Sequence, residues 1–319
     1  MSTPMSPLKV RNHGRHAAPS PSRTRLIVPA LLVIMGVFVM LYPVITTVWN
    51  NQQAAHVAEE YSRLDNDISQ ETKNQEWEEA KRYNNDHATG PILDPWINKV
   101  RGKSSAYENY LQLLDSNTAM ARLVIPHIQV DLPIYHGTDN ETLQKGLGHL
   151  YGSDLPVGGD GTHSVITGHT GLPNATMFDN LRDVKEGDSF FIQVSGHKLK
   201  YTVDQIQVVL PEEVDSLKTG TQGDYVTLIT CTPYGINTHR LLVRGHAAPI
   251  TSEDAQVFDQ VHAQIWAWWM YLLIAAAGIA LLLLVRWLIK QHRAINKRGE
   301  IAEPQAYTPT LSREINDTH

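Results

Sequence analysis

The chain has 319 residues, of which 42% are hydrophobic and 19% charged, and its formal net charge at pH 7 is -6. This length and apolar content allow one substantial core with appended segments. The mild negative charge and the lack of long basic stretches interleaved with aromatics exclude nucleic acid as an expected partner.

The first apolar segment, residues 26–49, contains no charged residue. As a helix it would be about 36 Å long, enough to cross a hydrocarbon core of about 30 Å. A cleaved signal peptide is the alternative, because basic residues precede the segment. Its apolar stretch is longer than the usual signal-peptide core of about 7 to 15 residues, and no small-residue cleavage site follows it. We therefore expect an uncleaved transmembrane helix.

A second apolar segment, residues 265–289, is uncharged up to Val285 and begins with an aromatic belt that includes Trp266, Trp268 and Trp269. A buried core helix is the alternative, but the length and the belt favour a second membrane span. Basic residues precede the first span in residues 1–25 and follow the second span. This pattern places both termini in the cytoplasm and residues 50–264 outside the cell membrane.

Between the spans, residues 50–118 are expected to be mainly helical. Residues 52–85 are polar and lack Gly and Pro, which is typical of a helical stalk or cap, and residues 98–114 could hold another short helix. A Gly- and Pro-containing loop at about residues 90–98 separates the two.

Residues 119–250 consist of short runs rich in Val, Ile, Leu and Tyr, separated by turn residues, which predicts a mainly β domain. Seven or eight such strands fit a closed or nearly closed barrel. Residues 251–264 are expected to be a juxtamembrane linker, and residues 290–319 a cytoplasmic tail that is disordered. The predicted strands are residues 121–128, 130–135, 163–168, 189–194, 198–210, 225–230 and 240–246.

The single cysteine, Cys231, closes one of these apolar strands just before a Pro-Tyr-Gly turn. A lone thiol forms no intramolecular disulfide, although the predicted extracellular location would permit one. If residues 225–230 and 240–246 are neighbouring strands, Arg240 flanks the same loop as Cys231. A permanently charged guanidinium favours the reactive thiolate and can hold a developing oxyanion. We therefore expect Cys231 to be a nucleophile assisted by Arg240.

A proton carrier must be chosen from 15 histidines. The strongest candidate is His169, because it follows an apolar strand and precedes a Gly/Pro loop, a setting that mirrors that of Cys231. Ordinary surface or structural roles are expected for the other histidines considered, with His239 the nearest rival. These others are His127, His136, His149, His163, His239 and His246.

Several motifs resemble those of one family. The run Thr-Leu-Ile-Thr-Cys at 227–231 is similar to the TLxTC signature of sortases, and Thr-Gly-His-Thr-Gly at 167–171 resembles their histidine motif. The nine-residue offset from Cys231 to Arg240 resembles the pilin-polymerising class C branch. Segments 134–138 and 155–159 extend the match, so the resemblance runs from about residue 90 to 247.

The resemblance implies a membrane-anchored cysteine transpeptidase of Gram-positive bacteria with an eight-stranded β-barrel. Cys231, His169 and Arg240 fall on the family's catalytic positions. By analogy, Cys231 would attack the Thr-Gly carbonyl of an LPxTG-like sorting signal and form a thioacyl enzyme. A lysine of another pilin subunit would then accept the acyl group, so the implied partners are LPxTG-bearing pilin subunits and the lipid bilayer.

Asp94, Pro95 and Trp96 resemble the class C lid, in which the acidic residue pairs with the catalytic arginine and the aromatic covers the cysteine. An ordinary turn is the alternative reading of Asp-Pro. With the family resemblance, we expect a lid that must move before substrate binds.

Two other functions stay open at this stage. A housekeeping sortase or cysteine protease would use the same three residues but pass the acyl group to a cell-wall peptide or to water. A non-enzymatic membrane scaffold would use the barrel only for binding. No cofactor is expected, and no metal, because there is one cysteine and no close paired spacing of histidines.

Overall fold

The structure is a computed structural model that describes residues 24–86, 104–213, 217 and 222–301. The chain divides into two compact units. Within the described residues, one unit contains residues 24–40 and 274–301, which belong to the first and last helices. The other unit spans residues 41–273 and holds all of the strands.

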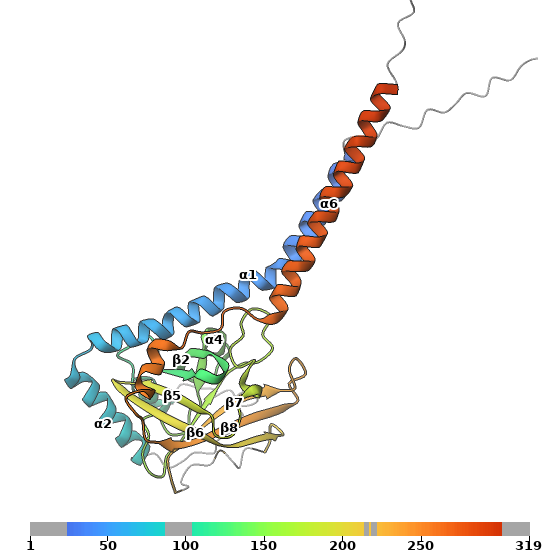
Figure 1. Cartoon of the computed structure of the whole chain (residues 1–319). Coiled ribbons are helices and arrows are strands. Elements are labelled where there is room, and N and C mark those ends of the chain that lie inside the picture. The colour runs from blue at the N-terminus through green and yellow to red at the C-terminus, as the bar shows by residue number, and fades with distance from the viewer. Residues whose placement is uncertain (1–23, 87–103, 214–216, 218–221, 302–319) are drawn as a thin grey trace, which may run out of the picture. The chain divides into compact units, whose positions relative to one another are not determined.

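Within the described residues, eight strands close into a barrel in the order β1-β2-β3-β4-β7-β8-β6-β5, which confirms the predicted fold class (Figure 1). The pairs β2–β3 and β4–β7 are parallel, and the other neighbours are antiparallel. The bounds are β1 Ala121–Ile125, β2 Val130–His136, β3 Leu147–His149, β4 His163–Thr167, β5 Ser189–Val194, β6 His197–Val209, β7 Tyr225–Thr232 and β8 His239–Ala248.

Each of the seven predicted strands corresponds to an observed strand, with small differences at the ends. The predicted strand 121–128 is shorter in the structure, because Pro126–Ile128 forms a 3-10 turn, η1. Proline has no N–H to donate to a strand ladder. The eighth strand, β3, was missed because three residues are too short to show a periodic pattern.

Strand β1 is rich in apolar residues because both of its faces are covered. Every position of β1 is buried. Leu123 belongs to the main core inside the barrel, while its neighbour Val124 packs outside with Phe191 and Phe258. A sheet covered on both faces shows continuous apolar runs rather than strict alternation.

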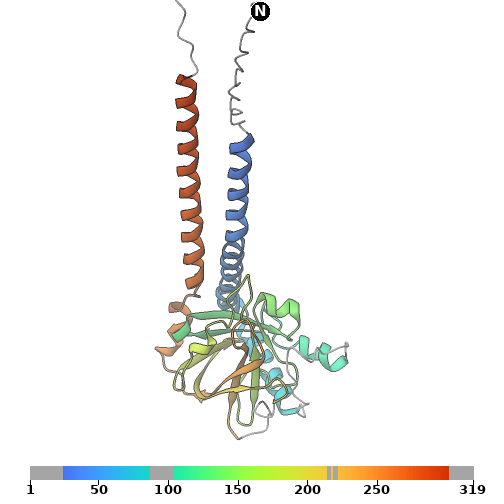
Figure 2. The ribbon, with the colours of Figure 1, turned by 90° about the vertical axis from the view of Figure 1, so that its right-hand side faces the viewer.

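In the part of the chain that the structure describes, three helices precede the barrel: α1 Thr24–Asp67, α2 Gln70–Asp86 and α3 Ser105–Leu111. The first predicted span, residues 26–49, is therefore continuous with the first half of the polar helix predicted for residues 52–85. The end of α1 packs on the barrel, where the buried carboxylate of Asp65 accepts hydrogen bonds from Gln193 Nε2 at 3.1 Å and from Gly196 N at 3.0 Å. Residues 41–67 and α2 thus cover the barrel rather than form a free stalk (Figure 1 and Figure 2).

A buried ion pair joins three parts of this unit. Arg122 in β1 binds both carboxylate oxygens of Asp131 in β2, at 2.7 and 2.6 Å. The same guanidinium donates to Ser62 Oγ in α1 and to the main-chain oxygen of Phe258. These bonds fix α1 and the segment after β8 to the side of the barrel formed by β1 and β2.

The segment after β8 differs from the linker predicted for residues 251–264. It contains a 3-10 turn, η4 (Asp254–Gln256), and a short helix, α5 (Val257–Gln260), and Phe258 is buried against the barrel. Lys200 pairs with Asp254 at 2.9 Å. Apolar and charged side chains of the predicted juxtamembrane linker thus dock on β5 and β6.

The last helix, α6 (Trp268–Ile301), begins three residues after the predicted start of the second span. It also continues beyond residue 290, so residues 290–301 are helical and the predicted disordered tail is wrong for this part. Among the described residues, two helical stretches, Leu26–Asp67 and Trp268–Ile295, are long and apolar enough to cross a membrane.

Candidate active site

Cys231 lies near the end of β7 and is 8% exposed. Along this strand, Val226 and Leu228 enter the main core inside the barrel, while Ile229 packs in a separate outer cluster with Leu242. Residues two apart in a strand share a face, so Cys231 is on the outer face with Ile229. The apolar residues of β7 thus hold the thiol at the rim of the barrel.

Arg240 is the direct partner of Cys231 in the antiparallel β7–β8 ladder. Cα atoms of such partners are about 4.5–5.5 Å apart, and their side chains lie on the same face. The arginine is 7% exposed, and its Nη1 donates to the main-chain oxygens of Asn237 at 3.3 Å and His239 at 3.2 Å. The predicted proximity of these two residues is therefore seen in the strand register.

His169 follows β4 on the opposite side of β7. The parallel β4–β7 ladder ends with the pair Thr167 and Ile229, and Gly168 N then donates to Ile229 O at 3.0 Å. Extending this register by two residues brings His169 level with Cys231, on the same face. The residues predicted from sequence therefore come from β7, from β8 and from the segment just after β4, with Cys231 on the middle strand.

Burial lowers the pKa of His169 below its ordinary value. The neutral imidazole is therefore favoured at neutral pH, and neutral imidazole can accept a proton. His169 can therefore act as a general base, which a permanently charged side chain cannot do.

The loop after His169 is held by hydrogen bonds that sequence reasoning did not foresee. Phe178 N donates to His169 O at 3.0 Å. The Oδ1 atom of Asp179 accepts from Thr170 Oγ1 at 3.0 Å and from Gly171 N at 2.7 Å. Burial raises the pKa of Asp179 to about 6. No local sequence pattern predicts these contacts of Asp179, because they form only when the loop folds back on residues 170 and 171.

The other histidines occupy structural settings. His149 is fully buried, with Nδ1 2.9 Å from the Tyr110 hydroxyl and Nε2 2.8 Å from the main-chain oxygen of Asp154. His239, the nearest rival, is the β7–β8 partner of Thr232, and its Nδ1 lies 2.9 Å from Thr238 Oγ1. Further contacts join His127 to Asp188, His136 to Leu113 O, His163 to Thr227 and His246 to Asp204.

Arg244 shares the outer face of β8 with Arg240 but lies four residues further along. It pairs with Thr227 in the ladder, and its guanidinium binds Asp204 through two hydrogen bonds of 3.0 Å. It also lies 4.7 Å from the centroid of the Tyr225 ring. Arg244 therefore forms an ion pair with Asp204 away from Cys231.

The predicted lid residues Asp94, Pro95 and Trp96 lie outside the described residues. Across the part of the chain that the structure describes, no group of three or more His, Cys, Asp or Glu side chains is arranged to hold a metal ion.

Comparison with protein families matches residues 123–248 to the Sortase domain. Among solved structures, sortase C-1 from Actinomyces oris is 56% identical, with a TM-score of 0.55, and the alignment covers 56% of this chain and 99% of that one. Sortase C from Streptococcus pneumoniae is 40% identical with a TM-score of 0.57, covering 62% of this chain and 98% of that one. The structure of the Streptococcus pneumoniae protein is described as giving insights into catalysis and pilin substrate specificity.

Among curated proteins, Sortase A of Bacillus anthracis is 24% identical over 132 residues, which is 41% of this chain. The chain spans 61% of the length of that relative. The solved class C structures are therefore similar to it over nearly their whole length, while this curated relative matches only in part.

Proposed function

The chain belongs to the sortase family, and from this premise we propose that it is a membrane-anchored cysteine transpeptidase that builds covalent pili. Its donor substrate is a pilin with an LPxTG-like sorting signal, and its acceptor is a lysine of another pilin subunit. The observation that carries this proposal is the register of β4, β7 and β8, which supports a shared site for His169, Cys231 and Arg240.

In the first step, the Sγ atom of Cys231 attacks the carbonyl carbon between Thr and Gly of the sorting signal. A C–S bond forms and the C–N bond breaks, while His169 takes the proton of the Cys231 thiol and then gives it to the leaving amine. The product is a thioester between the Thr carbonyl and Cys231. The fragment that begins with Gly leaves.

In the second step, the ε-amine of the acceptor lysine attacks the thioester carbon. His169 takes the proton of the amine, for which the lowered pKa of its imidazole is suitable. The C–S bond breaks, the thiol of Cys231 is restored, and an isopeptide bond joins the two subunits.

Arg240 provides the positive charge in both steps. Its guanidinium stays protonated at physiological pH, and its 7% exposure means that water screens this charge only weakly. The charge favours the thiolate of Cys231 and the oxyanion that forms on the substrate carbonyl.

The proposed gating and topology rest on the sequence. Asp94 pairs with Arg240 and Trp96 shields Cys231 until substrate arrives, with Pro95 shaping the turn between them. The two candidate membrane helices support anchoring of residues 50–264 on the outer side, with both termini in the cytoplasm.

The proposal is tested by incubating the full chain with an LPxTG-bearing pilin. We expect covalent ladders that survive boiling in detergent, and none with Cys231→Ala. Release of cleaved monomer only would contradict polymerase activity, while transfer to a cell-wall peptide alone would favour the housekeeping alternative.

A matched pair of substitutions tests the role of Arg240. Arg240→Lys keeps the charge but changes the donor geometry, and it should lower kcat about 100-fold, as removal of an oxyanion donor does in other enzymes. Arg244→Lys lies on the same face of β8 and should leave kcat within about twofold, because Arg244 binds Asp204. Equal losses in both variants would refute the assigned role of Arg240.

A further inference from the structure

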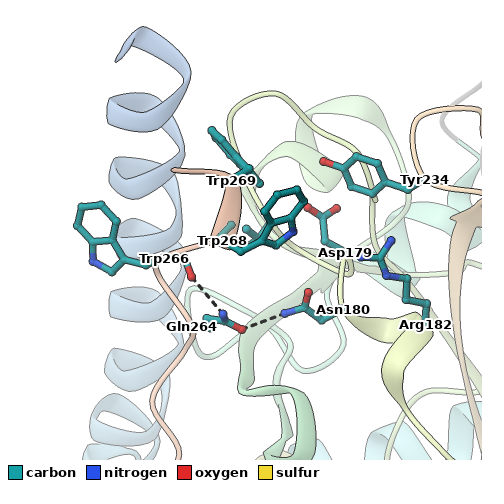
Figure 3. A pocket seen from close by; sticks show the side chains of 10 residues that line it. Asp179, Asn180, Arg182, Tyr234, Gln264, Trp266, Trp268 and Trp269 are labelled. Atoms are coloured by element: carbon teal, nitrogen blue, oxygen red, sulfur yellow. Dashed lines mark hydrogen bonds between the residues drawn. The ribbon is translucent and has the colours of Figure 1, made fainter. Parts of the chain in front are cut away.

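A cavity of about 340 Å³ lies beside the candidate active site and is not used by the chemistry described above. We call it the Trp pocket. Its walls come from the loop after β4, the loop after β7 and the start of α6 (Figure 3). The lining residues that matter here are Asp179, Arg182, Tyr234, Trp266, Trp268 and Trp269.

The Trp pocket is close to the catalytic residues along the chain. Tyr234 follows Cys231 by three residues, so their Cα atoms are at most about 11 Å apart. Asp179 accepts a hydrogen bond of 2.7 Å from Gly171 N, and Gly171 is two residues after His169. Two residues span at most about 8 Å. The pocket therefore opens beside both loops that leave the candidate active site.

The walls of the Trp pocket are aromatic, and Trp266, Trp268 and Trp269 are also the belt expected at the outer membrane surface, so the pocket faces the membrane interface. Trp268 is 70% exposed, Tyr234 47% and Trp266 43%. Faces of Trp and Tyr attract cations as well as apolar groups. A polypeptide with a cationic side chain suits such walls.

One carboxylate faces this aromatic enclosure. The side chain of Asp179 points toward the space between Trp268 and Tyr234 (Figure 3). Its loop contacts all use Oδ1, and within the described part of the chain Oδ2 accepts no hydrogen bond. Burial raises the pKa of Asp179 to about 6, and the hydrogen bonds from Gly171 and Thr170, together with the charge of Arg182, offset only part of this shift. The carboxylate is thus incompletely neutralised by its surroundings.

Arg182, which also lines the pocket, has other contacts. Its guanidinium lies 5.8 Å from the Tyr234 ring centroid and 4.0 Å from Asp183 Oδ1. Its side chain is 54% exposed, which places its charge toward water. The two side-chain amides that line the pocket already form hydrogen bonds. Asn180 donates to Gln264 at 3.0 Å, and Gln264 donates to Trp266 O at 3.1 Å.

We propose that the Trp pocket receives the lysine-bearing segment of the acceptor subunit, with Asp179 as the counter-charge of the lysine ammonium before it reaches the thioester. This inference rests on the proposed function. The aromatic walls hold the polypeptide and the stem of the lysine, and the carboxylate draws the ammonium toward His169. The ammonium loses one proton to water, and the neutral amine then attacks the thioester as in the second step above. An anionic ligand is disfavoured because the ionised carboxylate of Asp179 would repel it.

The test separates the two halves of the reaction in the full chain in detergent. A peptide containing Leu-Pro-Xaa-Thr-Gly is the donor, and Nα-acetyl-lysine amide or hydroxylamine is the acceptor. Asp179→Asn keeps an oxygen for Thr170 and Gly171 but removes the charge. Glu186→Gln, an exposed change further along the same segment, is the matched control.

With Asp179→Asn, we expect KM for the lysine acceptor to rise about fivefold to tenfold, as for loss of one partly buried ion pair. Formation of the thioacyl enzyme and the rate with hydroxylamine, which is too small to need the pocket, should change much less. Arg182→Gln should lower KM for the lysine acceptor, because it removes a like charge. Glu186→Gln should match the wild type.

Two results would overturn the inference in different ways. An unchanged lysine KM in Asp179→Asn, or a higher lysine KM in Arg182→Gln, would refute the acceptor site while leaving the proposed function intact. Absence of a thioacyl enzyme in the wild type would refute the proposed function and this inference together.

Discussion

Lowering the pH from 7.5 to 4.5 should destabilise the barrel through His149. This histidine in β3 is fully buried, and burial lowers its pKa from 6.5 to about 4. Its ring nitrogens lie within hydrogen-bond distance of the Tyr110 hydroxyl and of the main-chain oxygen of Asp154. The folded protein therefore keeps the imidazole neutral at a pH where the unfolded chain would protonate it.

The sign and size of the effect follow from proton binding. Above pH 6.5 both states are neutral at this residue and the stabilisation is complete. Between pH 6.5 and about 4 the imidazole of His149 is protonated in the unfolded chain but stays neutral in the folded chain. The free energy of unfolding therefore decreases as the pH falls. At roughly 1.4 kcal/mol per pH unit, the full loss is about 3 kcal/mol.

Thermal unfolding of the wild type and of His149→Gln from pH 7.5 to 4.5 measures this contribution. Glutamine does not titrate, and the other carboxylates and histidines are common to both proteins. The wild type should therefore lose about 5–10 °C more than the variant, using about 2–4 °C per kcal/mol for a unit of this size. A constant difference in Tm between the two proteins across this range would refute the reasoning.

Two further predictions concern packing and gating. Arg122→Met leaves the carboxylate of Asp131 buried without its partner and should lower the free energy of unfolding by about 3–5 kcal/mol. Loss of the partly exposed pair in Arg244→Met should cost about 1 kcal/mol or less, and equal losses would contradict this account. Trp96→Gly should speed maleimide labelling of Cys231 severalfold if Trp96 covers the thiol, whereas an unchanged rate would exclude the lid.

The barrel and the alignment of Cys231 with Arg240 could be predicted from sequence because they depend on local patterns. Apolar runs define β7 and β8, and a short loop between them requires antiparallel neighbours. Local patterns alone did not predict the position of His169 beside Cys231. This position depends on the parallel β4–β7 pair, which joins segments about 60 residues apart. The motif resemblance supplied this information.

Contacts between distant segments were not predictable from pattern. Strand β3 is too short to show periodicity, and its place depends on parallel pairing with β2. The docking of α1 depends on buried polar contacts such as that of Asp65 with Gly196. The Trp pocket combines two loops and the start of α6, which are far apart in the chain, so neither its shape nor the setting of Asp179 has a sequence signature.

The most direct test of the central claim is the intact mass of the full chain after incubation with a peptide containing Leu-Pro-Xaa-Thr-Gly. We predict an adduct equal to the acyl fragment that ends in Thr, located on Cys231 by peptide mapping, together with a released fragment that begins with Gly. Cleavage without an adduct on Cys231, or cleavage that persists in Cys231→Ala, would contradict the proposed chemistry.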